Sequence, residues 1–174
     1  DLSISFSKYK NRVHAYFNNG YANEINNYNL VFNNLPIWIT EWNLQYSKKT
    51  GNTHLQGLFV ANYFLELISN PLLKNIKLTT FHNLAGRDFG GSVFQMKNNI
   101  THIQSTFTPL KMISKFFKDD KTLVLKEKIN DDLYKYTFSN DNGTVSICWL
   151  NWSIEQFKTD LISDDFNKIE ECYA

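Results

Sequence analysis

The sequence contains little cysteine, proline or glycine, and its charges nearly cancel. Its two cysteines, Cys148 and Cys172, lack the spacing of a zinc or redox pair, and two are too few to staple a chain of 174 residues through disulfides. Eighteen Lys and Arg against seventeen Asp and Glu give a net charge of +1. Because this balance would not attract a polyanion, we expect no nucleic-acid partner.

A long apolar run is also missing. No segment approaches the roughly 20 apolar residues of a membrane-spanning helix, and Asp1-Leu2-Ser3 does not begin a signal peptide. We therefore expect a soluble chain without a membrane span, and its compartment, secreted or cytoplasmic, stays open. With 43% hydrophobic and 16% aromatic residues, the chain has enough apolar material for a packed core.

Several catalytic motifs are absent as well. The glycine-rich segment 86–91 has neither the G-x-G-x-x-G order nor the lysine of a phosphate-binding loop. The sequence contains no Gly-x-Ser-x-Gly motif of a serine hydrolase and no cluster of His, Cys and carboxylates with metal-ligand spacing. We expect neither a cofactor nor a bound metal.

Strands and helices are expected to alternate along the first two thirds of the chain. Hydrophobic periodicity and turn residues predict strands at 12–17, 36–42 and 76–82, and helices at 21–33, 55–68 and 108–117. Such an order is typical of a parallel sheet covered by helices, with right-handed crossovers.

The pattern changes at Leu123. Three segments that read as strands, 123–129, 133–138 and 144–149, are separated by turns rich in Asn, Asp and Gly. They predict an antiparallel meander. The segment beyond residue 152 fits a helix and a strand equally well.

Glu41 is the strongest functional candidate. It lies near the C-terminal end of the apolar strand 36–42, and a carboxylate at the end of a buried strand must be paired or used. In parallel α/β folds the site lies beyond the C-terminal ends of the strands, and Trp38, Trp42 and Tyr46 would offer flat surfaces suited to a sugar ring. The alternative is a salt-bridged glutamate beside structural tryptophans.

The segment Leu35-Pro36-Ile37-Trp38-Ile39-Thr40-Glu41-Trp42-Asn43-Leu44 resembles the nucleophile segment of a clan of retaining glycoside hydrolases. This clan includes β-xylosidases, α-L-arabinofuranosidases and heparanase-like enzymes. The resemblance implies an α/β fold in which residues 1–120 are the C-terminal part of a (β/α)8 barrel. Residues 121–174 would then be an antiparallel, β-sandwich-like segment of an appended β-domain. A complete barrel takes about 250 residues, so the rest of it would lie outside this chain.

The resemblance also implies a reaction. Glu41 would be the nucleophile of a double displacement on a polysaccharide or oligosaccharide, and a second carboxyl would act as acid/base. In the clan this second residue belongs to an Asn-Glu pair at a strand end, whereas Asn23-Glu24 lies in an expected helix. We therefore expect the acid/base outside this chain, and glycosidase activity if the upstream barrel half is present. The residues expected to bind the substrate are His14, Tyr16, Trp38, Trp42, Asn43 and His82.

A second hypothesis has no catalysis. The chain would be a glycan- or protein-binding module derived from a barrel, using Trp38, Trp42 and Tyr46, while Tyr16 would be an ordinary strand-end residue and His82 a wall residue. An open parallel sheet leaves an unpaired edge, so we expect the partner to be the missing N-terminal barrel half or a second copy of the chain.

Overall fold

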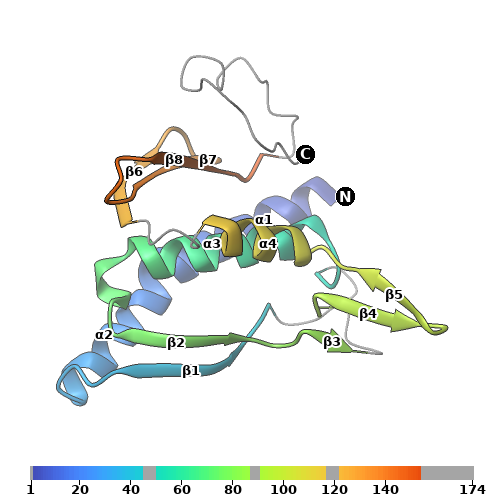
Figure 1. The fold of residues 1–174 in the computed structure, drawn as a ribbon, viewed down its shortest axis with the longest axis horizontal. Coiled ribbons are helices and arrows are strands. Elements are labelled where there is room, and N and C mark those ends of the chain that lie inside the picture. The colour runs from blue at the N-terminus through green and yellow to red at the C-terminus, as the bar shows by residue number, and fades with distance from the viewer. Residues whose placement is uncertain (1, 45–49, 87–90, 117–121, 154–174) are drawn as a thin grey trace.

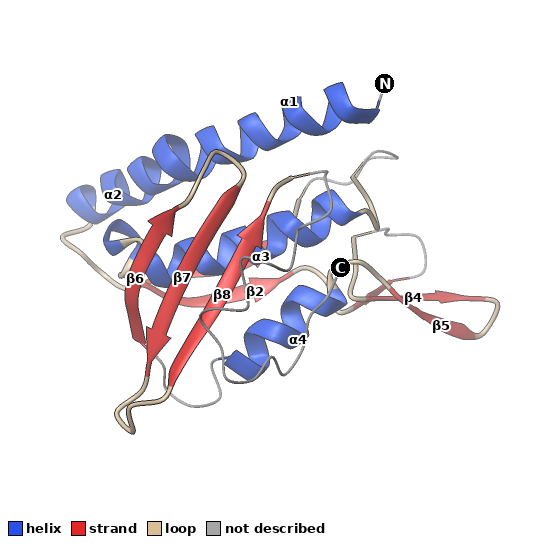
Figure 2. Cartoon of the chain, turned by 90° about the horizontal axis from the view of Figure 1, so that it is seen from above, coloured by secondary structure: helices blue, strands red, loops and turns tan. Residues whose placement is uncertain are grey.

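A computed structural model describes residues 2–44, 50–86, 91–116 and 122–153, and they form three layers (Figure 1). Helices occupy the middle layer, a parallel two-stranded sheet lies on one side, and an antiparallel three-stranded sheet lies on the other. A third small sheet ends in a hairpin that projects beyond the helices (Figure 2). Tyr46 and the predicted elements beyond residue 153 lie outside the described residues.

The elements follow one another in the order helices, strand, helix, strands, helix, meander. The helices are α1 (Leu2–Ala15), the π-helix η1 (Tyr16–Tyr21), α2 (Ala22–Val31), α3 (His54–Ser69), the 3-10 turn η2 (Pro71–Leu73) and α4 (Phe107–Phe116). The strands are β1 (Ile37–Trp42), β2 (Ile76–Phe81), β3 (Ala85–Gly86), β4 (Phe94–Lys97), β5 (Ile100–Ile103), β6 (Thr122–Lys128), β7 (Leu133–Ser139) and β8 (Val145–Asn151). The predicted helices 21–33, 55–68 and 108–117, the strands 36–42 and 76–82 and the meander are confirmed.

The strand expected at residues 12–17 is wrong. Those residues belong to α1 and η1, which continue into α2 as one helical rod (Figure 2). Val13, Phe17 and Tyr21 recur every four residues and are all buried. This helical spacing, which places three core residues on one face, outweighs the short alternation that suggested a strand.

The described residues do not form the expected part of a (β/α)8 barrel either. Within the described residues the parallel sheet contains β1 and β2 alone, and β3 pairs with β4 in a different sheet. A barrel requires every strand to have a hydrogen-bonded neighbour on both sides, which this open pair does not provide. The β-sandwich is likewise absent, because the described β6–β8 sheet packs on helices instead of a second sheet (Figure 1). The boundary near residue 120 stays a prediction.

The hairpin β4–β5 was not predicted from the sequence. Its two strands pair Phe94 with Ile103 and Lys97 with Ile100, and the turn consists of Asn98 and Asn99. Both asparagines have positive φ, 52° and 60°, as a two-residue hairpin turn requires. The signal was available, because Asn tolerates this backbone region and Asn98-Asn99 separates two alternating segments.

The pairing of β1 with β2 contains an irregularity that decides where Glu41 lies. Between Ile39 and Trp42, β1 has one residue more than β2 has between Thr79 and Phe81. Strict alternation would place Glu41 on the core side with Ile39. The extra residue instead brings Trp42 to the core side and leaves Glu41 exposed.

Helix α3 forms the centre of the core. On the side of the parallel sheet, Tyr63 of α3 stacks on Trp42, with ring centroids 3.9 Å apart. Phe17 of the helical rod packs against the same Tyr63 ring at 5.8 Å. The hydrophobic core continues through the helical layer to Tyr136 and Phe138 of β7.

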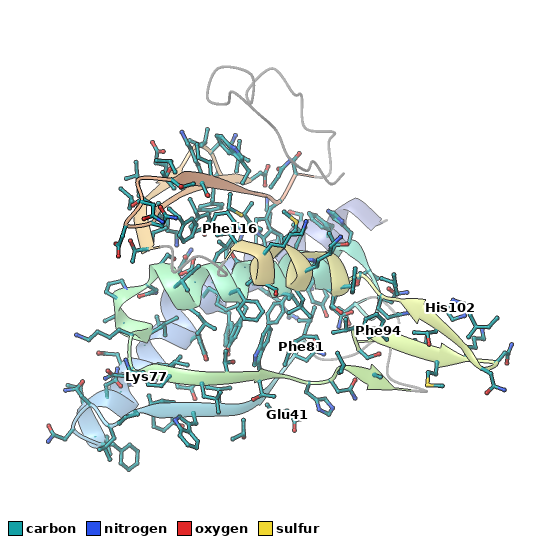
Figure 3. All side chains as sticks on the ribbon, viewed as in Figure 1. Glu41, Lys77, Phe81, Phe94, His102 and Phe116 are labelled. Carbon is teal, nitrogen blue, oxygen red and sulfur yellow. The ribbon has the colours of Figure 1, made fainter. Side chains whose placement is uncertain are left out.

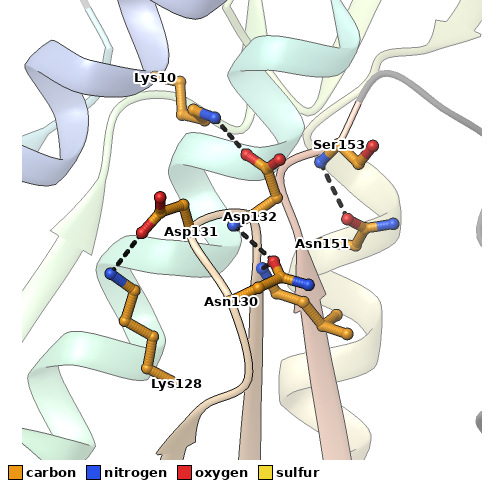
Figure 4. Close-up of polar contacts among 8 residues, drawn as sticks. Lys10, Lys128, Asn130, Asp131, Asp132, Asn151 and Ser153 are labelled. Carbon is orange, nitrogen blue, oxygen red and sulfur yellow. Dashed lines mark hydrogen bonds and ion pairs between the residues drawn. The ribbon is translucent and has the colours of Figure 1, made fainter.

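Charged contacts attach the meander to the helices. Lys10 of α1 pairs with Asp132 in the β6–β7 turn, which is ordered by hydrogen bonds from the backbone of Asp132 and Leu133 to Asn130 (Figure 4). Lys126 of β6 donates to the carboxylate of Glu66 on α3 at 2.5 Å. The Glu66 side chain is only 5% exposed, so this carboxylate depends on Lys126 for its charge partner.

We predict that Lys126→Met lowers the free energy of unfolding by about 3 kcal/mol, because it leaves the buried Glu66 carboxylate unpaired. Urea unfolding of the two proteins measures the difference. Adding Glu66→Gln to the Lys126→Met background should recover most of the loss. Lys128→Met is the matched control, because the Lys128–Asp131 pair is exposed to solvent, and the unfolding midpoint of this variant should not change. Equal effects of the two lysine substitutions would contradict this prediction.

Candidate functional site

A pocket of about 480 Å³ opens among η1, α2, β1 and α3. Its lining residues are aromatic and aliphatic, together with two glutamates and one asparagine. The aromatic residues are Tyr16, Tyr21, Tyr28, Phe32, Trp42, Phe59 and Tyr63, the aliphatic ones are Ile25, Ile37 and Ile39, and the remainder are Glu24, Glu41 and Asn43. Flat apolar rings next to hydrogen-bond acceptors are suited to a ligand that has both C–H faces and hydroxyl groups.

Glu41 lies on the rim of this pocket at the end of β1. Its side chain is 68% exposed, and Figure 3 shows it on the side of β1 that faces away from the helical layer. Oε1 of Glu41 lies 4.0 Å from Nδ1 of His82, the residue that follows β2. The two ends of the parallel strands thus bring together a carboxylate and an imidazole, as expected for the C-terminal edge of such a sheet.

Asn43 holds these two strand ends together. Its Nδ2 donates to the backbone oxygens of His82 and of Gly91, the second at 2.9 Å. Its Oδ1 accepts from Gln56 of α3 at 3.2 Å. Because both ends of the amide are engaged inside the protein, Asn43 positions Glu41 and His82 in addition to lining the pocket.

The two expected sugar-stacking tryptophans occupy different places. Trp42 lines the pocket, but it is only 9% exposed and its face is covered by Tyr63. Trp38 is 68% exposed and is not among the residues that line the pocket. Trp42 therefore forms part of the floor, and the flat surfaces offered to a ligand come from other residues.

Tyr16 and His14, which were both expected to bind substrate, lie in different parts of the structure. Tyr16 lines the pocket from η1, and burial, followed by the negative charge of Glu24, raises the pKa of its hydroxyl. His14 lies near the end of α1 and packs edge-on against Trp152 and Tyr134, with centroid distances of 5.1 and 5.7 Å. The structure thus brings Tyr16, Glu41, Trp42, Asn43 and His82 together and places His14 against the meander.

The floor of the pocket is neutral. The hydroxyls of Tyr21 and Tyr63 are 2.8 Å apart and hydrogen-bonded to each other in the interior. Burial raises the pKa of both tyrosines, so neither ionises near neutral pH. These two tyrosines therefore add no charge to the floor of the pocket.

The pocket residues that sequence reasoning did not propose include three on the α2 side, Glu24, Tyr28 and Phe32. They follow one another at intervals of four, so they lie in one row along α2. The helix itself was predicted, and the same spacing could have suggested the row. The sequence did not show that strand β1 lies beside this row, because the two segments meet only in the folded chain.

Two further observations concern metal ions and membranes. Within the described ranges, no three His, Cys, Asp or Glu side chains gather as a metal ion would require. None of the helices in that part of the chain combines the length and apolar character needed to cross a bilayer.

We predict that His14 makes stability depend on pH through packing. Burial, and then the charge of Lys10, lower the pKa of His14 below its ordinary value of 6.5, so the folded state favours the neutral ring. This contribution to stability is present above pH 6.5 and is lost as the pH falls through the lowered pKa. His14→Phe keeps an aromatic ring there, so its stability should fall less than that of the unaltered protein between about pH 7 and pH 5. Urea unfolding at each pH measures this, and parallel pH profiles would contradict it.

Comparison with protein-family models, with curated proteins and with solved structures finds no match for this chain. Its function must therefore be argued from the residues of the site.

Proposed function

We propose that this chain supplies the nucleophile of a retaining glycoside hydrolase, with Glu41 as the attacking carboxylate. The observation that carries the proposal is the position of Glu41, an exposed strand-end glutamate that borders an aromatic-lined pocket. Sugar rings offer apolar faces to aromatic side chains and hydroxyl groups to carboxylates, so this combination suits a carbohydrate better than a purely apolar ligand.

The sequence around Glu41 gives separate support. Segment 35–44 resembles the nucleophile segment of retaining glycosidases, and here Glu41 lies at a strand end beside a pocket. A nucleophile must be reachable by its substrate, and the Glu41 side chain is 68% exposed.

The reaction would proceed in two displacements. Glu41 attacks the anomeric carbon and forms a glycosyl ester, while the bond to the leaving oxygen breaks and the acid/base protonates that oxygen. The same group then removes a proton from water, the water attacks the anomeric carbon, and Glu41 leaves as a carboxylate. The product is a free sugar with retained configuration.

Asn43 and His82 have supporting roles in this proposal. Asn43 joins the end of β1 to the backbone of His82, so the two strand ends that carry the nucleophile and the imidazole are held together. The His82 ring, 4.0 Å from the carboxylate, can contact a hydroxyl group of the sugar bound at Glu41. The acid/base is proposed to lie outside this chain, because the Asn23-Glu24 pair lies in α2 and not at a strand end.

A non-catalytic glycan-binding module is the second candidate. The observation that favours it is the exposure of Glu41, since a carboxylate in contact with solvent can accept hydrogen bonds from a sugar without attacking it. This candidate predicts glycan binding without release of a reducing sugar.

Glu41→Gln in the full protein is expected to reduce kcat by at least about 10³-fold, because the amide cannot form the glycosyl ester. The assay follows release of nitrophenol from a panel of aryl glycosides, including β-xyloside, α-L-arabinofuranoside and β-glucoside. A 2-deoxy-2-fluoro analogue of the best substrate should label the peptide containing Glu41, as seen by mass spectrometry. Glu127→Gln, a change of the same type on β6 and outside the pocket, is the control. Near-normal kcat in Glu41→Gln would refute the assignment, and glycan binding without turnover by the unaltered protein would favour the second candidate.

A second test concerns the acid/base. Removing that residue leaves activated substrates able to form the ester, and azide then speeds its breakdown by replacing the water that lacks a base. We expect no azide acceleration of a 2,4-dinitrophenyl glycoside by Glu24→Ala. Acceleration by azide, with a glycosyl azide as product, would place the acid/base at Glu24 and within this chain.

A further inference from the structure

Two aromatic side chains of α2 and its C-terminal end are exposed at the pocket. Tyr28 is 47% and Phe32 55% exposed, and both line the pocket. Their rings are nearly parallel, with centroids 6.3 Å apart and an angle of 18° between the planes. Together the two rings present exposed apolar surface at the pocket, here called the platform.

The platform continues into a carboxylate. Glu24 lies one turn before Tyr28 in the same row, and the row from Glu24 to Phe32 extends over roughly 12 Å of helix. Glu41 lies on β1 at the same pocket. A ligand held at Glu41 therefore has a second binding surface on the helix, longer than a single sugar ring needs.

The charges of the pocket restrict the ligand further. Its charged lining residues among the described parts of the chain are Glu24 and Glu41, and neither lysine nor arginine lines it there. A carboxylate at the pocket, such as that of Glu24, repels a uronic acid or a sulfated sugar, whereas it accepts hydrogen bonds from neutral hydroxyl groups. A neutral oligosaccharide matches both the flat rings and the acceptors.

We propose that Glu24, Tyr28 and Phe32 form a second sugar-binding subsite, which holds an uncharged oligosaccharide whose neighbouring residue lies at Glu41. The inference rests on the proposed function in that it takes the Glu41 pocket to be a sugar site. Tyr28 and Phe32 stack on the rings of the chain, and Glu24 accepts a hydrogen bond from a hydroxyl group. The subsite makes the protein prefer longer chains to short ones.

The test measures binding of hexasaccharides to the full protein by calorimetry, in the Glu41→Gln background so that no probe is consumed. The neutral probes are xylohexaose, cellohexaose and mannohexaose, and the anionic probe is hexagalacturonate. Tyr28→Ala/Phe32→Ala should weaken binding of the best neutral hexasaccharide by at least about tenfold. The loss should be smaller for the corresponding disaccharide, which is too short to occupy both subsites.

The same helix provides a matched control. Leu30 and Val31 are each 74% exposed, lie between Tyr28 and Phe32 in sequence and do not line the pocket. Leu30→Ala/Val31→Ala should change the dissociation constant by less than about twofold. Circular dichroism checks that both double variants keep the helix content of the parent.

The possible outcomes separate the two proposals. Weaker hexasaccharide binding by Tyr28→Ala/Phe32→Ala, with no such change in the control variant, supports the subsite. If aryl glycoside turnover is independent of Glu41, the proposed function fails, but this result still supports a sugar-binding site. Equal losses in both double variants, equal binding of hexagalacturonate, or no binding of any hexasaccharide would each overturn the subsite. Hydrolysis that depends on Glu41 would still support the proposed function in those cases.

Discussion

The burial of α3 on two sides is the constraint on which the other parts of the structure depend. Phe59 and Tyr63 face the parallel sheet, where Tyr63 stacks on Trp42. Glu66 faces the meander and is held by Lys126. A helix with neighbours on both sides must carry apolar residues around most of its circumference, and α3 does so. The structure has three layers because the apolar surface of α3 is buried by a sheet on each side.

The stacking of Trp42 on α3 also positions the candidate site. Adjacent residues of a strand point in opposite directions, so fixing Trp42 in the core turns Glu41 to the rim. Asn43 then joins the end of β1 to the end of β2, and His82 is kept beside the carboxylate. Three consecutive residues thus have three tasks: exposure of a carboxylate, anchorage in the core, and fixation of the strand ends.

The pocket brings together residues from two parts of the chain with different properties. The β1 side contributes the carboxylate of the resembling segment, and the α2 side contributes a row of exposed aromatic rings. Neither side alone would suggest an oligosaccharide, because a strand-end glutamate is common and exposed rings on a helix are common too. Their presence at one pocket, with carboxylates as its charged groups among the described residues, is what favours a neutral sugar chain.

The sequence by itself determined the local elements and the strongest candidate residue. Helix α3, strand β1 and the meander follow from apolar periodicity and from turns rich in Asn and Gly, which are local properties of the chain. Glu41 stands out because a charge is rare in so apolar a strand.

The tertiary structure decided the rest. Residues 12–17 are helical and do not form the expected strand, because a helix places Val13, Phe17 and Tyr21 on one buried face. The parallel sheet of β1 and β2 is open in the described chain, since strand pairing depends on distant segments. The extra residue in β1 turned Glu41 outward, and the row on α2 became part of a site only when β1 packed beside it. These are contacts between residues far apart in sequence, so local patterns do not contain them.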